Sequence, residues 1–271
     1  MPYISLNGCN YYYESHGEGS ETLVLSHGLL WSGHLFYKQV AFLKDHYRVI
    51  TYDHRGQGRS EVTPDGYDMD SLYADAVALI ETLQLGPVHF GGLSMGGFVA
   101  MRLAARRPDL LRSLILMETS AQPEPNKLKY GILNAIVKLF GVASVTQPVM
   151  KIMFGDTFLQ DNSRKAEREE WTRELQKNKK TIVKAVSGVL NRQGVEQELP
   201  QIQCPTLILV GKEDKATVPE KAAFMHTHIR GSVLHEVEKA GHTATIEAPE
   251  AYNRLIADFL TQTSSHEKTG K

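Results

Sequence analysis

The sequence predicts an α/β fold, with a mostly parallel central sheet, helices on both faces of that sheet, and a helical insertion. Two observations lead to this class. Short apolar segments rich in Val, Ile and Leu are typical of strands buried on both faces, and segments with helical periodicity lie between them. Residues 121–200 differ, because they contain no strand-like segment and several helical patterns.

The first residues predict an antiparallel hairpin at an edge of the sheet. The segments "YISL" and "NYYYES" flank the pair Asn7-Gly8, which is favoured in tight hairpin turns because both residues tolerate positive φ. The buried strands are then expected at 22–26, 47–53, 87–92, 111–118 and 205–211.

Helices are expected between these strands and throughout the insertion. The segment 70–84 is the clearest, with apolar residues at helical spacing, and 34–45 and 95–107 are similar. Inside the insertion, helical patterns cover 127–141, 145–154, 163–179 and 181–191. We therefore expect a core of residues 1–120 and 201–262, a helical cap of 121–200 inserted after the sixth strand, and a disordered tail of 263–271.

Composition and charge exclude several classes of function. The 271 residues carry a formal net charge of −1 with no cluster of Lys or Arg, so no nucleic-acid partner is expected. No secretory signal pattern and no run of about 18 apolar residues is present, so we expect a cytoplasmic protein without a membrane partner. Cys9 and Cys204 follow no metal-binding spacing, so neither a disulfide framework nor a metal site is expected.

The glycine-rich segment "HFGGLSMGG" contains the pattern G-x-S-x-G at residues 92–96. It follows a strand-like run and precedes a helix-like run, which is the setting that exposes a nucleophilic serine on a sharp turn. Glycines are needed there because neighbouring chain segments approach too closely for a Cβ. A glycine-rich connection without catalytic function is the alternative, and the spacing does not match a phosphate-binding G-x-G-x-x-G turn.

Ser94 needs a base, an acid that orients the base, and donors for an oxyanion, because a serine hydroxyl is a weak nucleophile. His242 lies in a loop after one predicted strand. Asp214, with Glu213 beside it, lies in the loop after another, and Glu118 ends a third at the same edge. The chain order is then serine, acid, histidine, with the choice of acid left open at this point.

The chain resembles the α/β-hydrolase superfamily, particularly its cap-bearing esterases and lactonases, over residues 20 to 262. The matching segments, in the order typical of the family, are "LSHGLLWSG", "YDHRGQGRS", "GLSMGG", "LVGKEDKATVP" and "AGHTATIEAPE". The resemblance implies that Ser94 is the nucleophile, His242 the general base and then acid, and Asp214 the orienting acid, with Glu118 second. It also implies an oxyanion hole formed by the backbone N–H groups of Leu29 and Met95.

Two further expectations follow from the resemblance. Asp53 and Arg55 are expected to form an ion pair that shapes the loop beside the site, and His27 to brace the oxyanion loop through hydrogen bonds.

The implied reaction is acyl transfer from an ester or lactone through a serine acyl-enzyme, with no metal and no organic cofactor. The protein is expected to act on a small molecule as a monomer or homodimer.

The motifs are most similar to those of 3-oxoadipate enol-lactonases and related esterases, and hydrolysis of acyl-homoserine lactones is one specific activity within that range. Cofactor-free perhydrolases, also called haloperoxidases, usually carry an aromatic residue where this chain has Leu29, and carbon–carbon bond hydrolases often carry an asparagine in place of Leu93. A non-enzymatic receptor is a further alternative. Apolar residues of the insertion expected to line an acyl pocket are Leu139, Phe140, Met150, Met153 and Phe154.

Overall fold

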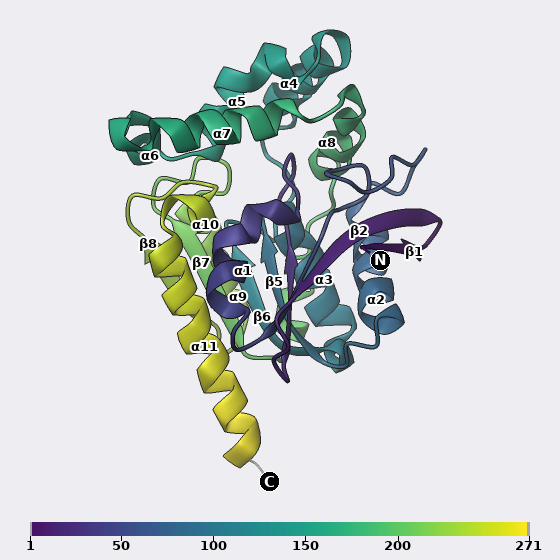
Figure 1. Cartoon of the computed structure of the whole chain (residues 1–271), viewed down its shortest axis with the longest axis vertical. Helices are drawn as coiled ribbons and strands as arrows, with labels where there is room; N and C mark the ends of the chain where they lie inside the picture. The colour runs from purple at the N-terminus through teal and green to yellow at the C-terminus, as the bar shows by residue number, and fades with distance from the viewer. Residues whose placement is uncertain (1, 270–271) are drawn as a thin grey trace.

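The computed structural model describes residues 2–269 and contains one eight-stranded sheet, in the order β1-β2-β4-β3-β5-β6-β7-β8 (Figure 1). The pairs β1–β2 and β2–β4 are antiparallel, and the remaining pairs are parallel. The strands are β1 (Tyr3–Leu6), β2 (Cys9–His16), β3 (Thr22–Ser26), β4 (Arg48–Tyr52), β5 (Val88–Leu93), β6 (Leu111–Met117), β7 (Thr206–Gly211) and β8 (Val233–Val237). The predicted fold class is confirmed.

The N-terminal hairpin forms as the turn pair predicts. Leu6 pairs with Cys9, so the connection consists of two residues. Asn7 and Gly8 both have positive φ, at 47° and 72°, as a two-residue hairpin turn requires. This hairpin forms one edge of the sheet, and the parallel strand β8 forms the other.

Helices cover both faces of the sheet because its central strands are buried on both sides. One hydrophobic cluster joins the sheet to α2 (Met69–Thr82), α3 (Met95–Arg106) and α9 (Pro219–His228). A second cluster joins the opposite face to α1 (Tyr37–Leu43) and α11 (Pro249–Thr269), and the short α10 (Ala244–Glu247) precedes α11. The loops that follow the parallel strands therefore meet at one edge of the sheet.

A helical layer lies beyond this edge, at the top of Figure 1, and we call it the insertion. It consists of α4 (Lys127–Phe140), α5 (Thr146–Met153), α6 (Asp156–Gln160), α7 (Lys165–Gln176) and α8 (Val183–Leu190). The sequence predicted four of these helices and missed the short α6. Buried apolar side chains of the insertion, among them Trp171 and Leu175, join the second hydrophobic cluster and so attach it to the sheet.

The C-terminal segment differs from the prediction. The sequence predicted disorder over 263–271, but α11 continues to Thr269, and residues 270 and 271 lie outside the described part of the chain. The helix continues because its next turn is still attached to the core: the Ser264 hydroxyl donates to the Glu21 carboxylate at 2.5 Å. Within residues 2–269, no helix combines the length and apolar content needed to cross a membrane.

Candidate active site

Ser94 occupies the sharp turn between β5 and α3 with an unfavourable backbone conformation. Its φ of 52° and ψ of −111° are strained for a residue with a Cβ. Two hydrogen bonds stabilise this strained conformation: the Ser94 N–H donates to the Met117 carbonyl at 2.9 Å, and the Ser94 carbonyl accepts from the Thr119 hydroxyl at 2.8 Å. The turn therefore presents the Ser94 side chain at the carboxyl edge of the sheet.

Glycines around this turn allow backbone segments to touch. A Cβ on Gly96 would lie 2.0 Å from the Ser26 carbonyl oxygen, and one on Gly92 would lie 2.3 Å from the Gly96 carbonyl oxygen. Both distances are far shorter than a real contact, so α3 packs against β3 and β5 only without side chains at these positions. The close approach expected from the sequence is present.

His242 connects Ser94 to Asp214 through two hydrogen bonds. His242 Nε2 lies 2.9 Å from Ser94 Oγ, and His242 Nδ1 lies 2.9 Å from Asp214 Oδ2. His242 and Asp214 come from the loops after β8 and β7, and both are buried. Three residues widely separated in the sequence therefore meet in the order that nucleophilic catalysis requires.

Asp214 is fixed as an acceptor by the loop that follows it. Its Oδ1 accepts from the backbone N–H groups of Ala216 and Thr217 at 2.8 and 2.9 Å, and its Oδ2 accepts from the Thr217 hydroxyl at 2.7 Å. An acceptor facing His242 Nδ1 favours the tautomer with its proton on Nδ1. The lone pair of Nε2 is then free to accept the Ser94 proton. Sequence reasoning did not single out Thr217.

The two alternative acids do not contact His242. Glu213 turns toward the insertion and accepts from Thr157 N at 2.8 Å and Thr157 Oγ1 at 2.5 Å. Glu118 is fully buried beside the Tyr252 hydroxyl, which donates to it. Burial raises the pKa of Glu118 well above its usual value, which disfavours the charged form that would stabilise an imidazolium. Asp214 is therefore the carboxylate that the structure places against the imidazole.

The two predicted oxyanion donors lie at suitable positions beside this turn. Met95 is the first residue of α3, so its N–H has no partner within the helix, and the helix N-terminus favours negative charge. Among the hydrogen bonds of residues 2–269, none involves the Leu29 N–H. Leu29 and Ser94 border the same cavity. Two backbone N–H groups are therefore available beside Ser94, as an oxyanion hole would require.

The loop that carries Leu29 is held by side chains on both sides. His27 Nε2 accepts from the His54 N–H at 2.9 Å, so the ring proton is on Nδ1, which donates to the Gly28 carbonyl at 2.7 Å. The next residue, Leu30, has a positive φ of 75°, and its N–H donates to Gln57 Oε1 at 2.8 Å. His27 therefore braces the loop as expected. Gln57 lies between the two glycines of "RGQGRS" and was not singled out.

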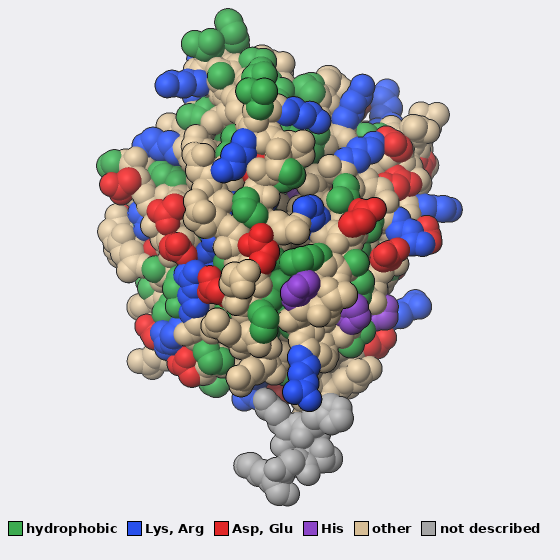
Figure 2. All heavy atoms as spheres, turned by 180° about the vertical axis from the view of Figure 1, so that it is seen from behind, with side chains coloured by type: hydrophobic (Ala, Val, Ile, Leu, Met, Phe, Trp, Pro, Cys, Tyr) green, Lys and Arg blue, Asp and Glu red, His purple; other side chains and the backbone are tan. Residues whose placement is uncertain are grey.

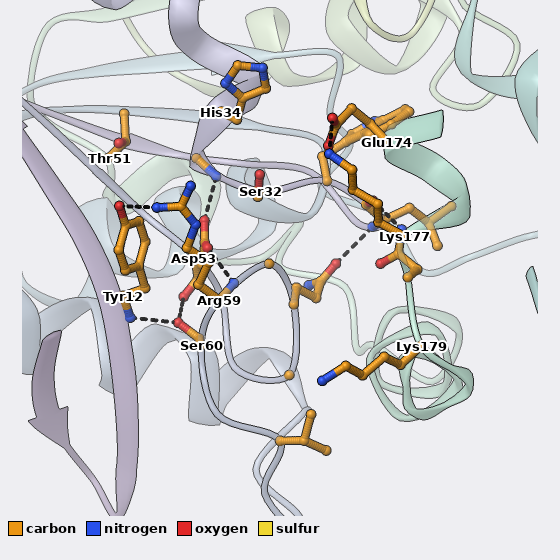
Figure 3. A pocket seen from close by; sticks show the side chains of 18 of the residues that line it. Tyr12, Ser32, His34, Thr51, Asp53, Arg59, Ser60, Glu174, Lys177 and Lys179 are labelled. Atoms are coloured by element: carbon orange, nitrogen blue, oxygen red, sulfur yellow. Dashed lines mark hydrogen bonds and ion pairs between the residues drawn. The ribbon is translucent and has the colours of Figure 1, made fainter. Parts of the chain in front are cut away.

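Asp53 and Arg55 do not form the predicted ion pair. Arg55 Nη2 lies 3.0 Å from Asp75 Oδ1 on α2, because the turn after β4 directs its side chain to that helix. Asp53 accepts instead from the backbone N–H groups of Gly33 and Arg59, each at 2.7 Å (Figure 3). Asp53 thus joins the segment after the oxyanion loop to the turn that carries Gln57. Asp53 therefore supports the loop through backbone donors, whereas Arg55 is held by Asp75.

Glu247 ties down the histidine loop and was also missed. Its carboxylate accepts from the N–H groups of Gly241 and Thr243, the neighbours of His242, and from Gly155 N–H in the insertion. The distances are 3.0, 3.1 and 2.8 Å. Burial raises the pKa of Glu247 to about 7 although these donors act in the opposite direction. A glutamate five residues after the histidine was the available signal.

A cavity of about 130 Å³ lies between the sheet edge and the insertion, and Ser94 and His242 border it. Most of its lining is apolar and comes from the insertion, including Val142, Val149 and Met153. An enclosed apolar wall beside a nucleophile suits an apolar acyl or alcohol group. A second hollow, lined by polar residues such as Asp53 and Arg59, is shown in Figure 3; it shares Leu30 with this cavity but does not include Ser94.

Of the five residues expected to line the acyl pocket, only Met153 does so. Met150 and Phe154 are buried in the core of the insertion, where the Phe154 ring lies 6.2 Å from that of Trp31. Leu139 and Phe140 are 66% and 71% exposed. Both residues lie in the last turn of α4, which ends at Phe140, and Figure 2 shows hydrophobic side chains gathered at the top of that face of the molecule. These four placements correct the prediction.

No group of three or more His, Cys, Asp or Glu side chains in the described chain is arranged to hold a metal ion. Ser94 and His242 border the cavity, and Asp214 binds the imidazole from the side away from the serine. This arrangement, on a mostly parallel sheet, is the one used by enzymes that attack carbonyl groups with an activated serine.

The chain belongs to the alpha/beta hydrolase fold family, whose model matches residues 21–249. A 3-oxoadipate enol-lactonase of Acinetobacter baylyi is 28% identical, over 90% of each chain. RutD of Stutzerimonas stutzeri, named provisionally as a carbamate hydrolase, is 26% identical over 93% of this chain and 97% of its own. The enol-lactonase from Burkholderia xenovorans LB400, whose crystal structure is known, is 27% identical in sequence. Its structure matches this one with a TM-score of 0.89, over 96% of this chain and 100% of that chain.

Proposed function

We propose that this protein hydrolyses carboxylic esters or lactones through an acyl-enzyme formed on Ser94. The observation that carries the proposal is the continuous chain of hydrogen bonds from Ser94 through His242 to Asp214, at 2.9 Å each. The similarity to enol-lactonases supports a carbonyl substrate in which the leaving group is an alcohol or enol.

The reaction begins when Ser94 Oγ attacks the substrate carbonyl carbon and His242 Nε2 accepts the hydroxyl proton. The charged imidazole is stabilised by Asp214, and the negative charge on the tetrahedral oxygen is stabilised by the N–H groups of Leu29 and Met95. The C–O bond to the leaving group then breaks, and His242 returns the proton to the departing oxygen. A water molecule, deprotonated by His242, releases the acid and restores Ser94.

The insertion serves in this proposal as a cap that covers the acyl group and limits access of bulk water. Its apolar residues, such as Val149 and Met153, border the cavity that Ser94 opens into. Low local polarity strengthens the interaction between the oxyanion and its donors.

The first test is labelling with a fluorophosphonate probe, followed by mapping of the labelled residue. We expect labelling of Ser94 in the wild type, no labelling and no turnover in Ser94→Ala, and an unchanged melting temperature. Hydrolysis retained by Ser94→Ala would refute the nucleophile. A panel of p-nitrophenyl esters, simple and acylated lactones, and aryl carbamates then ranks kcat/KM, the quantity that measures specificity. Open esters cleaved as well as lactones would remove the lactonase preference and leave a general esterase.

A further inference from the structure

Four polar or charged residues interrupt the apolar lining of the cavity at a distance from the reacting groups. They form what we call the polar cluster: Glu124, Tyr130, Asn134 and Arg192. The mechanism proposed above assigns them no role. Because an apolar cavity is simplest to build from apolar side chains, buried charges within its wall require a reason.

Arg192 is the centre of this cluster and is 6% exposed. Its Nη1 lies 3.1 Å from Glu124 Oε2 and 3.0 Å from the Val189 carbonyl, and its Nε donates to the Gln122 carbonyl at 3.2 Å. Within residues 2–269, no hydrogen bond is found for Nη2. Nη2 of Arg192 can therefore still donate a hydrogen bond, and Arg192 borders the cavity.

The position of Arg192 relative to the serine follows from Phe98. The guanidinium carbon lies 4.2 Å from the centre of the Phe98 ring, and the Phe98 N–H donates to the Ser94 carbonyl at 3.1 Å. Phe98 is thus one turn of α3 beyond the nucleophile and also borders the cavity. A ligand bound at Ser94 that extends along Phe98 reaches Arg192.

Asn134 supplies an acceptor on α4, beside α8. Its Nδ2 donates to the Val183 carbonyl at 3.3 Å and to Ser187 Oγ at 3.1 Å, while its buried Oδ1 has no hydrogen-bond partner within the described chain. The amide orientation is fixed, because a carbonyl such as that of Val183 can only accept. Asn134 and Tyr130 lie four residues apart on the face of α4 that borders the cavity.

The charges of the cluster determine what kind of ligand group it accepts. Glu124 already neutralises Arg192, so a ligand carboxylate beside Arg192 would also meet Glu124 where water is scarce. A ligand ammonium would likewise be repelled by the positive charge of Arg192. An uncharged group with one acceptor and one donor avoids both repulsions, because its acceptor can bind Arg192 Nη2 and its donor can bind Asn134 Oδ1.

We propose that the cavity selects esters or lactones whose apolar acyl part carries an uncharged donor–acceptor group, a carboxamide or a hydroxyl, bound between Arg192 and Asn134. This inference rests on the proposed function, because it assumes that the acyl group occupies the cavity beside Ser94.

The test compares p-nitrophenyl esters of matched chain length whose acyl ends carry a carboxamide, a hydroxyl, a methyl, a carboxylate or an ammonium group. At the best chain length, we expect kcat/KM for the carboxamide or hydroxyl ester to exceed that for the methyl ester roughly tenfold. The charged esters are expected to react more slowly than the methyl ester. Asn134→Leu should remove the preference, so that kcat/KM for the carboxamide or hydroxyl ester no longer exceeds that for the methyl ester.

Two further variants make the result decisive. Asn191→Leu is the matched control, because Asn191 is exposed at the end of α8 and borders no part of the cavity, so the preference should remain. Arg192→Met combined with Glu124→Leu removes both charges together and avoids leaving one buried and unpaired. This double variant should favour the methyl ester.

Equal rates for all uncharged esters, or a preference for the carboxylate ester, would overturn the inference and leave ester hydrolysis by Ser94 intact. Absence of hydrolysis of every ester, together with absence of fluorophosphonate labelling, would instead overturn the proposed function.

Discussion

Replacing Asp214 by asparagine is expected to lower kcat about 10⁴-fold, equivalent to about 5.5 kcal/mol in the activation free energy, while Glu118→Gln should leave kcat within about threefold of wild type. The reason lies in the hydrogen bonds around Asp214. The asparagine carbonyl can keep the two backbone donors, from Ala216 and Thr217, which now bind Oδ1. Its NH₂ group must then occupy the position of Oδ2, which faces His242 Nδ1 at 2.9 Å.

A donor at that position favours the opposite imidazole tautomer. Nδ1 would accept from the asparagine NH₂, the ring proton would move to Nε2, and Nε2 could no longer accept the proton of Ser94. Glu118 differs in both respects that matter. Burial raises its pKa and so disfavours the charged form, and its hydrogen-bond partner is Tyr252, not His242. Glutamine at this position therefore leaves the imidazole and its acceptor Asp214 unchanged.

The assay is steady-state hydrolysis of one p-nitrophenyl ester by wild type and both variants at the same pH, with kcat and KM determined separately. Thermal unfolding of each variant tests whether the fold is retained. A larger loss of kcat in Glu118→Gln than in Asp214→Asn, with both variants folded, would refute the assignment of the acid and the tautomer reasoning with it.

Three other predictions follow from the same contacts. Gly96→Ala should destabilise the fold by several kcal/mol, roughly the cost of a severe core clash, because its Cβ would lie 2.0 Å from a backbone carbonyl oxygen. Gly131→Ala on α4 is the contrast: its Cβ would meet nothing within 4 Å, so the change should stabilise the fold by about 0.5–1 kcal/mol. Urea unfolding measures both changes in the free energy of unfolding. Gln57→Leu removes the acceptor of the Leu30 N–H and should lower kcat roughly 10- to 100-fold with the melting temperature nearly unchanged, and an unaltered kcat would contradict the bracing role. Folding raises the pKa of Glu247 from 4.5 to about 7, so the contribution of this group to stability is fully present below pH 4.5 and is lost as pH rises through 7. Between these two pH values, Glu247 should lower the free energy of unfolding by about 1.4 kcal/mol per pH unit. Glu247→Gln should reduce this slope, which unfolding measured at several pH values tests.

The turn residues and the strand pattern made the fold and the meeting of Ser94, Asp214 and His242 predictable. Asn7-Gly8 determines a two-residue hairpin by its backbone preferences alone, and Gly92 and Gly96 determine the close packing around Ser94. His242 and Asp214 could be chosen because each follows a strand of a parallel sheet, and the carboxyl ends of such strands meet at one edge.

The supporting contacts could not be predicted, because they depend on how distant segments pack. Arg55 binds Asp75 instead of Asp53, and the difference depends on the direction of one loop relative to α2. Glu247 closes on Gly155, which is 92 positions away in the chain. Neither contact has a periodicity or a local spacing that a sequence pattern could reveal.

The cavity wall depends on packing even more strongly. The α4 helix has apolar residues around much of its circumference, and periodicity alone does not say which stripe faces inward. In the structure, Leu133 and Val137 line the cavity, whereas Leu139 lies at the exposed end of the helix.

The proposed reacting groups and the wall of the cavity therefore come from different parts of the molecule and can change independently. Ser94, Asp214 and His242 are positioned by turns at the edge of the sheet, and their geometry depends on backbone contacts that few side chains can replace. The wall comes mostly from helices of the insertion, where side chains can be exchanged without disturbing those turns. Substitutions such as Asn134→Leu are thus expected to change which ester is preferred, and substitutions at the sheet edge to change whether any ester is cleaved. This separation explains why turn motifs indicate the chemistry of the reaction, whereas the choice of substrate requires the packed insertion.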